Sequence, residues 1–207
     1  MNKGVVSVLV AYLIWGLYPF YFHAMQHVAP TEIVIHRVLW TFALLAVYLF
    51  CSRRWRWIQK AITDRRTVAV FLMSSVLITA NWSTYTYAIV TNQTLEASLG
   101  YFMNPLVSVL LGTVFLKEKL NKAQMLAIVF ACAGVMWVTF KQGEFPALGL
   151  TLALSFGFYG LVRKMAPLGS LEGLTLETAF AFPVALLATF YFAGNGDLTF
   201  VHGTSWD

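Results

Sequence analysis

The sequence has few charged residues. Only 11% of its 207 residues are Asp, Glu, Lys or Arg, whereas 59% are hydrophobic. Soluble domains usually contain about 25% charged residues, and a soluble chain of this length could not bury so much apolar surface. The scarcity of charge therefore excludes an ordinary soluble protein and indicates an integral membrane protein.

Cysteines are also scarce, and the motifs of common enzymes are missing. The chain has two cysteines, Cys51 and Cys132, and its four histidines lack metal-ligand spacing. It contains no Gly-x-Ser-x-Gly, no His-Glu-x-x-His and no Gly-rich phosphate loop ending in Gly-Lys-Ser/Thr. We therefore predict no enzyme activity, no catalytic residue, no metal and no cofactor. Active transport would need an ion or solute gradient because no nucleotide site is present.

The sequence does contain seven apolar stretches of 18 residues or more, and about 20 apolar residues of helix cross a membrane. Five of them carry no charge, and the other two carry one each, Arg37 and Glu177. The stretches are Val5–Phe22, Ile33–Phe50, Val68–Val90, Ala97–Leu116, Ala123–Phe140, Phe145–Val162 and Leu174–Ala193. We predict an all-α polytopic membrane protein with seven transmembrane helices. The first stretch is predicted to be a helix, not a cleaved signal peptide, because it lacks a small-x-small cleavage site.

Basic residues gather in alternate connections between these stretches. The connections on one side contain Lys3, Arg53, Arg54, Arg56, Lys60, Arg65, Arg66, Lys117, Lys119, Lys122, Arg163 and Lys164. Those on the other side contain only Lys141, and Arg37 lies within an apolar stretch. The positive-inside rule then predicts a cytoplasmic N-terminus and an outside C-terminus at Asp207. The excess of positive charge is expected to face anionic lipid headgroups, so no nucleic-acid partner is predicted.

A weak internal repeat relates the beginning of the chain to its end. Residues 15–19 (Trp-Gly-Leu-Tyr-Pro) align with residues 156–160 (Phe-Gly-Phe-Tyr-Gly), and with one deletion Glu32 and Arg37 align with Glu172 and Glu177. The first and sixth predicted helices run in opposite directions, so the repeat is inverted. Inverted repeats are common in secondary transporters, whose substrate site lies near the midplane between the copies.

The second copy is incomplete, because it contains only two of the five helices of the first. We therefore predict two units, residues 1–142 and the start of a second repeat in residues 143–207. We expect either that the chain is a fragment of a ten-helix protein or that a partner completes it.

The charged residues within or beside the membrane are candidates for gating or proton linkage. Glu32 and His36 are four residues apart and share a helix face, so they can form a proton-linked pair. Arg37 and Glu177 are predicted to lie near opposite entrances, where each could act as a gate. The alternatives are that Arg37 snorkels to the outer interface and that Glu177 is protonated or bonded to backbone donors.

Two polar stripes are candidates for substrate contact. One carries Asn81, Tyr85, Ala88 and Asn92, and the other carries Ala97, Tyr101, Asn104, Ser108 and Gly112. With the aromatic residues of the repeat they give the predicted substrate-binding set, which is Trp15, Tyr18, Asn81, Tyr85, Tyr101, Asn104 and Tyr159. Pro105 removes a backbone hydrogen bond beside Asn104 and favours a kink there. The alternative is that the asparagines only hold helices together.

The stretch 123–140 has small residues at helical spacing and no buried polar group. Ala123, Ala127, Ala131 and Gly134 form this seam. Such seams let helix backbones approach closely. We predict that this helix is a scaffold or a contact in a homo-oligomer.

Several motifs, in order along the chain, resemble a known family. They are Trp15-Gly16, the run from Ala29 to Trp40, Thr84-Tyr85, the run from Glu96 to Phe102, Asn104-Pro105, and the run from Phe115 to Leu120 with Gln124 and Gly134-Val135. Together they resemble the EamA domain of the drug/metabolite transporter superfamily, and most closely its RarD-like permeases. The resemblance covers the whole chain, with Ala127 where the family commonly has Gly.

The resemblance implies a ten-helix bundle of two inverted repeats in the bacterial inner membrane, with a central cavity. It also implies transport of small metabolites or drugs, usually export. The leading hypothesis is therefore a gradient-driven transporter of a small organic solute. The alternatives are a membrane scaffold or sensor that does not transport, and an intramembrane enzyme.

Overall fold

The computed structural model describes residues 3–53, 55–143 and 145–199, and every regular element in those ranges is a helix. The helices are α1 (Lys3–Ala24), α2 (Pro30–Ser52), α3 (Arg56–Thr63), α4 (Arg65–Val90), α5 (Thr94–Leu116), α6 (Lys122–Gln142), α7 (Ala147–Lys164) and α8 (Ser170–Asn195). The protein is thus an all-α polytopic membrane protein, as predicted. Arg54 and Asp207, which entered the topology prediction, lie outside the described residues.

Local sequence signals set several helix ends. Pro30 opens α2, where its missing N–H costs nothing. The Asp64 carboxylate accepts hydrogen bonds from the backbone of Thr67 at 3.2 Å and caps α4. Asn121 and Gln124 form a reciprocal capping box at the start of α6. At its other end, Gly143 has a φ of 73°, a conformation that glycine adopts at little cost.

Six of these helices are long and apolar enough to cross a membrane: α1, α2, α4, α5, α6 and α8. The seventh predicted span, Phe145–Val162, differs from the helix in the structure. That helix, α7, begins after Pro146 and ends with Arg163 and Lys164. These two basic residues lower its mean hydropathy, so composition identifies α7 as a span less well than the others. The short helix α3 lies in the basic connection between α2 and α4.

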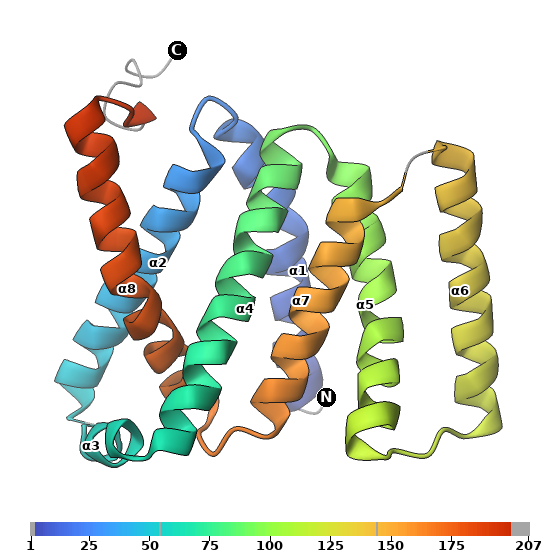
Figure 1. Ribbon diagram of the computed structural model, residues 1–207, viewed down its shortest axis with the longest axis horizontal. Coiled ribbons are helices and arrows are strands. Elements are labelled where there is room, and N and C mark those ends of the chain that lie inside the picture. Colours follow the sequence, from blue (N-terminus) through green and yellow to red (C-terminus); the bar gives the residue numbers. More distant parts are fainter. Residues whose placement is uncertain (1–2, 54, 144, 200–207) are drawn as a thin grey trace.

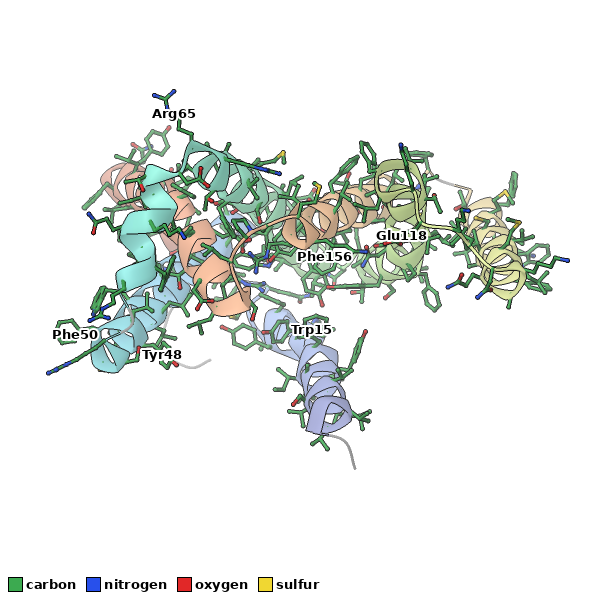
Figure 2. The ribbon with its side chains drawn as sticks, turned by 90° about the horizontal axis from the view of Figure 1, so that it is seen from below. Trp15, Tyr48, Phe50, Arg65, Glu118 and Phe156 are labelled. Atoms are coloured by element: carbon green, nitrogen blue, oxygen red, sulfur yellow. The ribbon has the colours of Figure 1, made fainter. Side chains whose placement is uncertain are left out.

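The long helices run up and down, and most of them stand in one row (Figure 1). Along this row the order of the helices is α4, α7, α5 and α6, and α2 and α8 cross each other beside α4. Helix α1 lies to one side of this row, as the view from below shows (Figure 2). Because the directions alternate, α1 begins and α8 ends at opposite ends of the molecule (Figure 1).

The basic residues are distributed unevenly between the two ends of the molecule. The end of the molecule that carries α3 also carries the end of α5, the start of α6 and the end of α7 (Figure 1). Ten of the basic residues lie there: Arg53, Arg56, Lys60, Arg65, Arg66, Lys117, Lys119, Lys122, Arg163 and Lys164. Lys141, at the end of α6, lies at the opposite end. The fold therefore has one basic end, which is called here the α3 end.

Helix α7, which belongs to the predicted second unit, packs between α4 and α5 of the predicted first unit (Figure 1). A Cβ atom on Gly100 of α5 would lie 2.9 Å from the carbonyl oxygen of Gly149 on α7. One on Gly149 would lie 2.9 Å from the carbonyl oxygen of Glu96. The two glycines thus allow the α5 and α7 backbones to touch. The sequence reading missed this seam.

The seam that the sequence reading did identify does not face the rest of the chain. No described residue of α6 is buried, and nothing lies within 4 Å of the space that a Cβ atom on Gly134 would occupy. Helix α6 packs mainly along α5, and its Val135 and Val138 lie against the cluster of Leu99, Met103 and Ala153. A role for this seam in a homo-oligomer stays a prediction.

Candidate functional site

A cavity of about 820 Å³ lies between α1 and α2. Its walls come from the second half of α1 and the first two thirds of α2, and most of them are aliphatic or aromatic. The lining residues are Ile14, Leu17, Tyr18, Tyr21, Phe22, Met25, Ile33, His36, Arg37, Trp40, Thr41 and Leu44. Small-molecule sites in proteins have volumes of about 300–1,000 Å³ and are mostly apolar with a few placed polar groups. The cavity matches that description.

Arg37 is the one Lys or Arg residue in this lining, and its side chain is partly exposed. Its guanidinium carbon lies 4.1 Å from the ring centre of Trp82 on α4 and 6.0 Å from that of Tyr18 on α1. A cation is attracted to an aromatic face at these distances. No residue in the described ranges forms an ion pair with Arg37. Its position therefore rests on aromatic faces, not on a carboxylate.

A chain of aromatic rings leads from the cavity across α4 to α5. Tyr18 contacts Phe22 with 6.0 Å between ring centres, and Phe22 contacts Tyr85 of α4 at 5.9 Å. Tyr85 in turn contacts Tyr101 of α5 at 5.8 Å. The structure thus brings together three of the predicted substrate residues, Tyr18, Tyr85 and Tyr101. Tyr18 lines the cavity and Tyr85 is buried behind its Phe22, whereas Tyr101 is 53% exposed on α5.

Glu32 and His36 meet as their spacing predicts. Their side chains lie 3.9 Å apart, and His36 lines the cavity. Glu32 is buried, and its carboxylate accepts hydrogen bonds from the backbone N–H and the hydroxyl of Thr199, at 2.9 and 2.6 Å. Glu32 therefore also ties the segment after α8 to the start of α2. The sequence reading had no signal for Thr199.

Glu177 lies in a second polar cluster, near the α3 end. Its side chain is fully buried and lies 3.6 Å from the Nε of Arg163 on α7. The hydroxyl of Ser74 on α4 donates to the Glu177 carboxylate, and the hydroxyl of Tyr159 donates to it at 3.3 Å. Ser75 donates to the Glu177 backbone carbonyl at 2.6 Å. The cluster thus joins α4, α7 and α8 around one buried carboxylate.

Arg163 and Ser74 were not among the predicted site residues. The sequence reading assigned Arg163 to a basic inner connection, but its side chain turns back beside Glu177 and is only 16% exposed. Tyr159 and Arg163 are four residues apart, so they share a face of α7. This spacing was the signal in the sequence that both side chains could contact the same residue, Glu177, on a neighbouring helix.

The remaining predicted substrate residues do not line the cavity. The Asn81 side chain is buried and donates to the carbonyl of Leu152 and the hydroxyl of Ser155, both on α7 and both at 3.1 Å. Asn104 lies on α5 and accepts a hydrogen bond from Ser108 of the same helix. Trp15 is 50% exposed on α1 (Figure 2). Asn81 therefore holds α4 to α7.

The two predicted copies of the repeat make comparable contacts in the structure. The sequence alignment places Tyr18 over Tyr159 and Arg37 over Glu177. In each copy the tyrosine contacts the charged residue of the next long helix, Tyr18 with Arg37 and Tyr159 with Glu177. Helices α1 and α7 also run in opposite directions (Figure 1). These contacts support the inverted register.

Comparison with known proteins gives one family. A model described as the EamA-like transporter family matches residues 2–140. The uncharacterized transporter YojE of Bacillus subtilis is 42% identical over 188 residues, which cover 89% of this chain and 63% of YojE. Protein RarD of Escherichia coli is 39% identical over 194 residues, which cover 94% of this chain and 66% of RarD.

A more distant relative is the chloramphenicol-sensitive protein RarD of Pseudomonas aeruginosa, 29% identical over 194 residues. These residues cover 92% of this chain and 65% of that protein. The chain thus spans just under two thirds of the length of these relatives. No solved structure matches the chain significantly.

Proposed function

Because this chain belongs to the EamA-like transporter family, we propose that it is a secondary transporter that exports small metabolites or drugs, driven by a gradient. The observation that carries this proposal is the cavity of about 820 Å³ between α1 and α2. It places one arginine and one histidine in otherwise mostly apolar walls, beside helices that are long enough to cross a membrane. Polar or ionisable side chains inside a membrane commonly mark solute or ion pathways.

The proposed path uses both charged clusters. The cavity at Arg37 lies in the half of α1 and α2 away from the α3 end, and Glu177 lies toward the α3 end. A solute bound between them would have Arg37 of the first copy toward one entrance and Glu177 of the second copy toward the other. Glu32 with His36 is the proposed proton-linked pair, because the two ionisable side chains lie 3.9 Å apart and His36 lines the cavity. Trp15, Tyr85, Tyr101, Asn104 and Tyr159 remain proposed contacts of the solute as it moves.

The proposed location is the bacterial inner membrane, with α7 as a seventh span and the N-terminus in the cytoplasm. The basic α3 end supports this orientation, because cytoplasmic connections carry an excess of Lys and Arg. Labelling of a cysteine introduced at Lys119 tests it, with Cys51 and Cys132 replaced by serine. A membrane-impermeant thiol reagent should leave position 119 unmodified in intact cells, and modification there would reverse the orientation.

Solute flux tests the transport function. Purified full-length protein in liposomes loaded with a mixture of small metabolites, under an imposed proton gradient, should change the rate at which particular solutes leave. Liposomes without protein give the background rate. If no solute moves faster than this background under either gradient direction, the chain acts as a membrane scaffold or sensor and the proposal is wrong.

A further inference from the structure

The cavity between α1 and α2 contains an unusual charge. Arg37 faces a space whose other lining side chains are apolar or uncharged, apart from His36, which contacts Glu32. Among the described residues Arg37 has no ion-pair partner, and its guanidinium lies against the rings of Trp82 and Tyr18. A charge in an apolar site is costly unless it is paired.

The second copy of the repeat shows how such a charge is paired when the protein supplies the partner. At the position equivalent to Arg37, Glu177 is neutralised by Arg163, which lies four residues after Tyr159 on α7. The residue four places after Tyr18 on α1 is Phe22, which packs in the aromatic chain behind the cavity. The first copy therefore has an apolar ring where the second copy has a counterion. Among the described residues the first copy supplies no counterion for Arg37, which leaves that place open to an anionic partner.

The chemistry of the site defines that partner. A guanidinium offers a planar fork of donors that matches a carboxylate. The aliphatic and aromatic walls would cover an apolar body, but they offer few groups to solvate a second negative charge, so a phosphate dianion fits poorly. We infer that the cavity binds an organic monocarboxylate with an apolar or aromatic body and that Arg37 holds its carboxylate. This inference rests on the proposed function and names the class of solute.

Two probes of the same shape test the inference. 3-Phenylpropanoate carries a carboxylate at neutral pH, and 3-phenylpropanamide replaces it with a neutral amide. Titration calorimetry of the full-length protein in detergent should show the carboxylate binding about tenfold or more tightly, because hydrogen bonds to charged groups are the stronger ones. Arg37→Gln should abolish this preference. Arg37→Lys should keep part of it, because it retains the charge without the planar fork.

Lys141→Gln is the matched control. Lys141 also lies over a tryptophan, 5.4 Å from the ring centre of Trp137, but on α6 and outside the cavity. Its loss should leave the preference for the carboxylate unchanged. Thermal unfolding of each variant shows whether Arg37→Gln keeps its fold, and Arg37→Lys carries the test if it does not.

Three outcomes overturn the inference: equal binding of both probes by the wild type, binding of neither, or an unchanged carboxylate preference in both Arg37 variants. None of them decides whether the protein transports. Solute flux in liposomes measures transport separately. If the protein bound both probes equally and still transported solutes, it would be a transporter of neutral solutes.

Discussion

Arg37 and Glu177 occupy equivalent positions in the two copies of the repeat, yet the protein surrounds them differently. Glu177 is fully buried and has its own cation, Arg163, together with hydroxyl donors from Ser74 and Tyr159. Arg37 is partly exposed to a cavity and rests on aromatic rings. The difference teaches that two aligned charged positions can serve two purposes. Glu177, which the protein pairs internally, also ties helices together at one end of the proposed path, whereas Arg37 faces the cavity and is available to a solute.

The largest expected effect comes from breaking the Glu177 cluster. Glu177→Leu leaves Arg163 buried without its carboxylate, and such a loss costs about 3 kcal/mol or more of the free energy of unfolding. Thermal unfolding in detergent measures it. The double variant Arg163→Met with Glu177→Leu should recover most of the loss, because it removes both charges. A double variant no more stable than Glu177→Leu would show that the pair does not account for the effect.

A smaller effect is expected at Asn81, which belongs to the same packed region. Asn81→Leu removes two hydrogen bonds to α7, and polar contacts of this kind between membrane helices are worth about 0.6 kcal/mol on average. Stability should fall by about that amount or somewhat more, while affinity for the carboxylate probe stays unchanged. Reduced affinity at unchanged stability would move Asn81 to the solute path.

Asn104→Leu is the matched variant on the other stripe. The hydrogen bond that Asn104 makes in the described structure is with Ser108 of its own helix, so its loss should cost less stability than Asn81→Leu. If Asn104 contacts the solute as proposed, this variant should instead weaken binding. Equal losses of stability in the two variants, with binding intact, would make both residues helix contacts.

The smallest effect on stability is expected at Asp64, whose carboxylate is exposed to solvent. It provides a reference for the effects expected at buried residues. The hydroxyl of Thr67 donates to Asp64 at 2.5 Å and holds its pKa below the usual value. The folded pKa thus lies below the unfolded one, so the contribution of Asp64 to stability is present above the unfolded pKa of about 3.9. It is lost as the pH falls through the folded value. Asp64→Asn should reduce the acid sensitivity of the melting temperature, and an unchanged pH profile would show that this cap contributes little.

The sequence predicts the helices well, because the thickness of the membrane sets the length of the charge-free stretches. All seven predicted stretches correspond to a helix in the structure, with boundaries shifted by a few residues. The single basic end also follows from the distribution of Lys and Arg along the chain. Helix α7 is the exception in composition, since its last two residues, Arg163 and Lys164, are basic.

The sequence predicts the site less completely. A stripe of polar residues on one helix does not indicate which neighbouring helix packs against it. Asn81 and Tyr85 are four residues apart on α4, yet Asn81 bonds to α7 while Tyr85 meets Phe22 of α1 and Tyr101 of α5. Arg163 and Glu177 are brought together only when α7 and α8 both pack against α4. The cavity between α1 and α2 likewise depends on the placement of α1 beside the row of helices (Figure 2).

The most direct test of the account measures flux and stability together for Arg37→Gln and Glu177→Gln. Each protein would be reconstituted in liposomes with 3-phenylpropanoate as the solute, and its melting temperature recorded in the same lipid. Arg37→Gln should lower the flux by about tenfold or more with the melting temperature retained, because it removes a charge-assisted bond to the solute. Glu177→Gln should lower the melting temperature. Normal flux in Arg37→Gln, or a loss of stability as large as that of Glu177→Gln, would contradict the division of roles between the two charges.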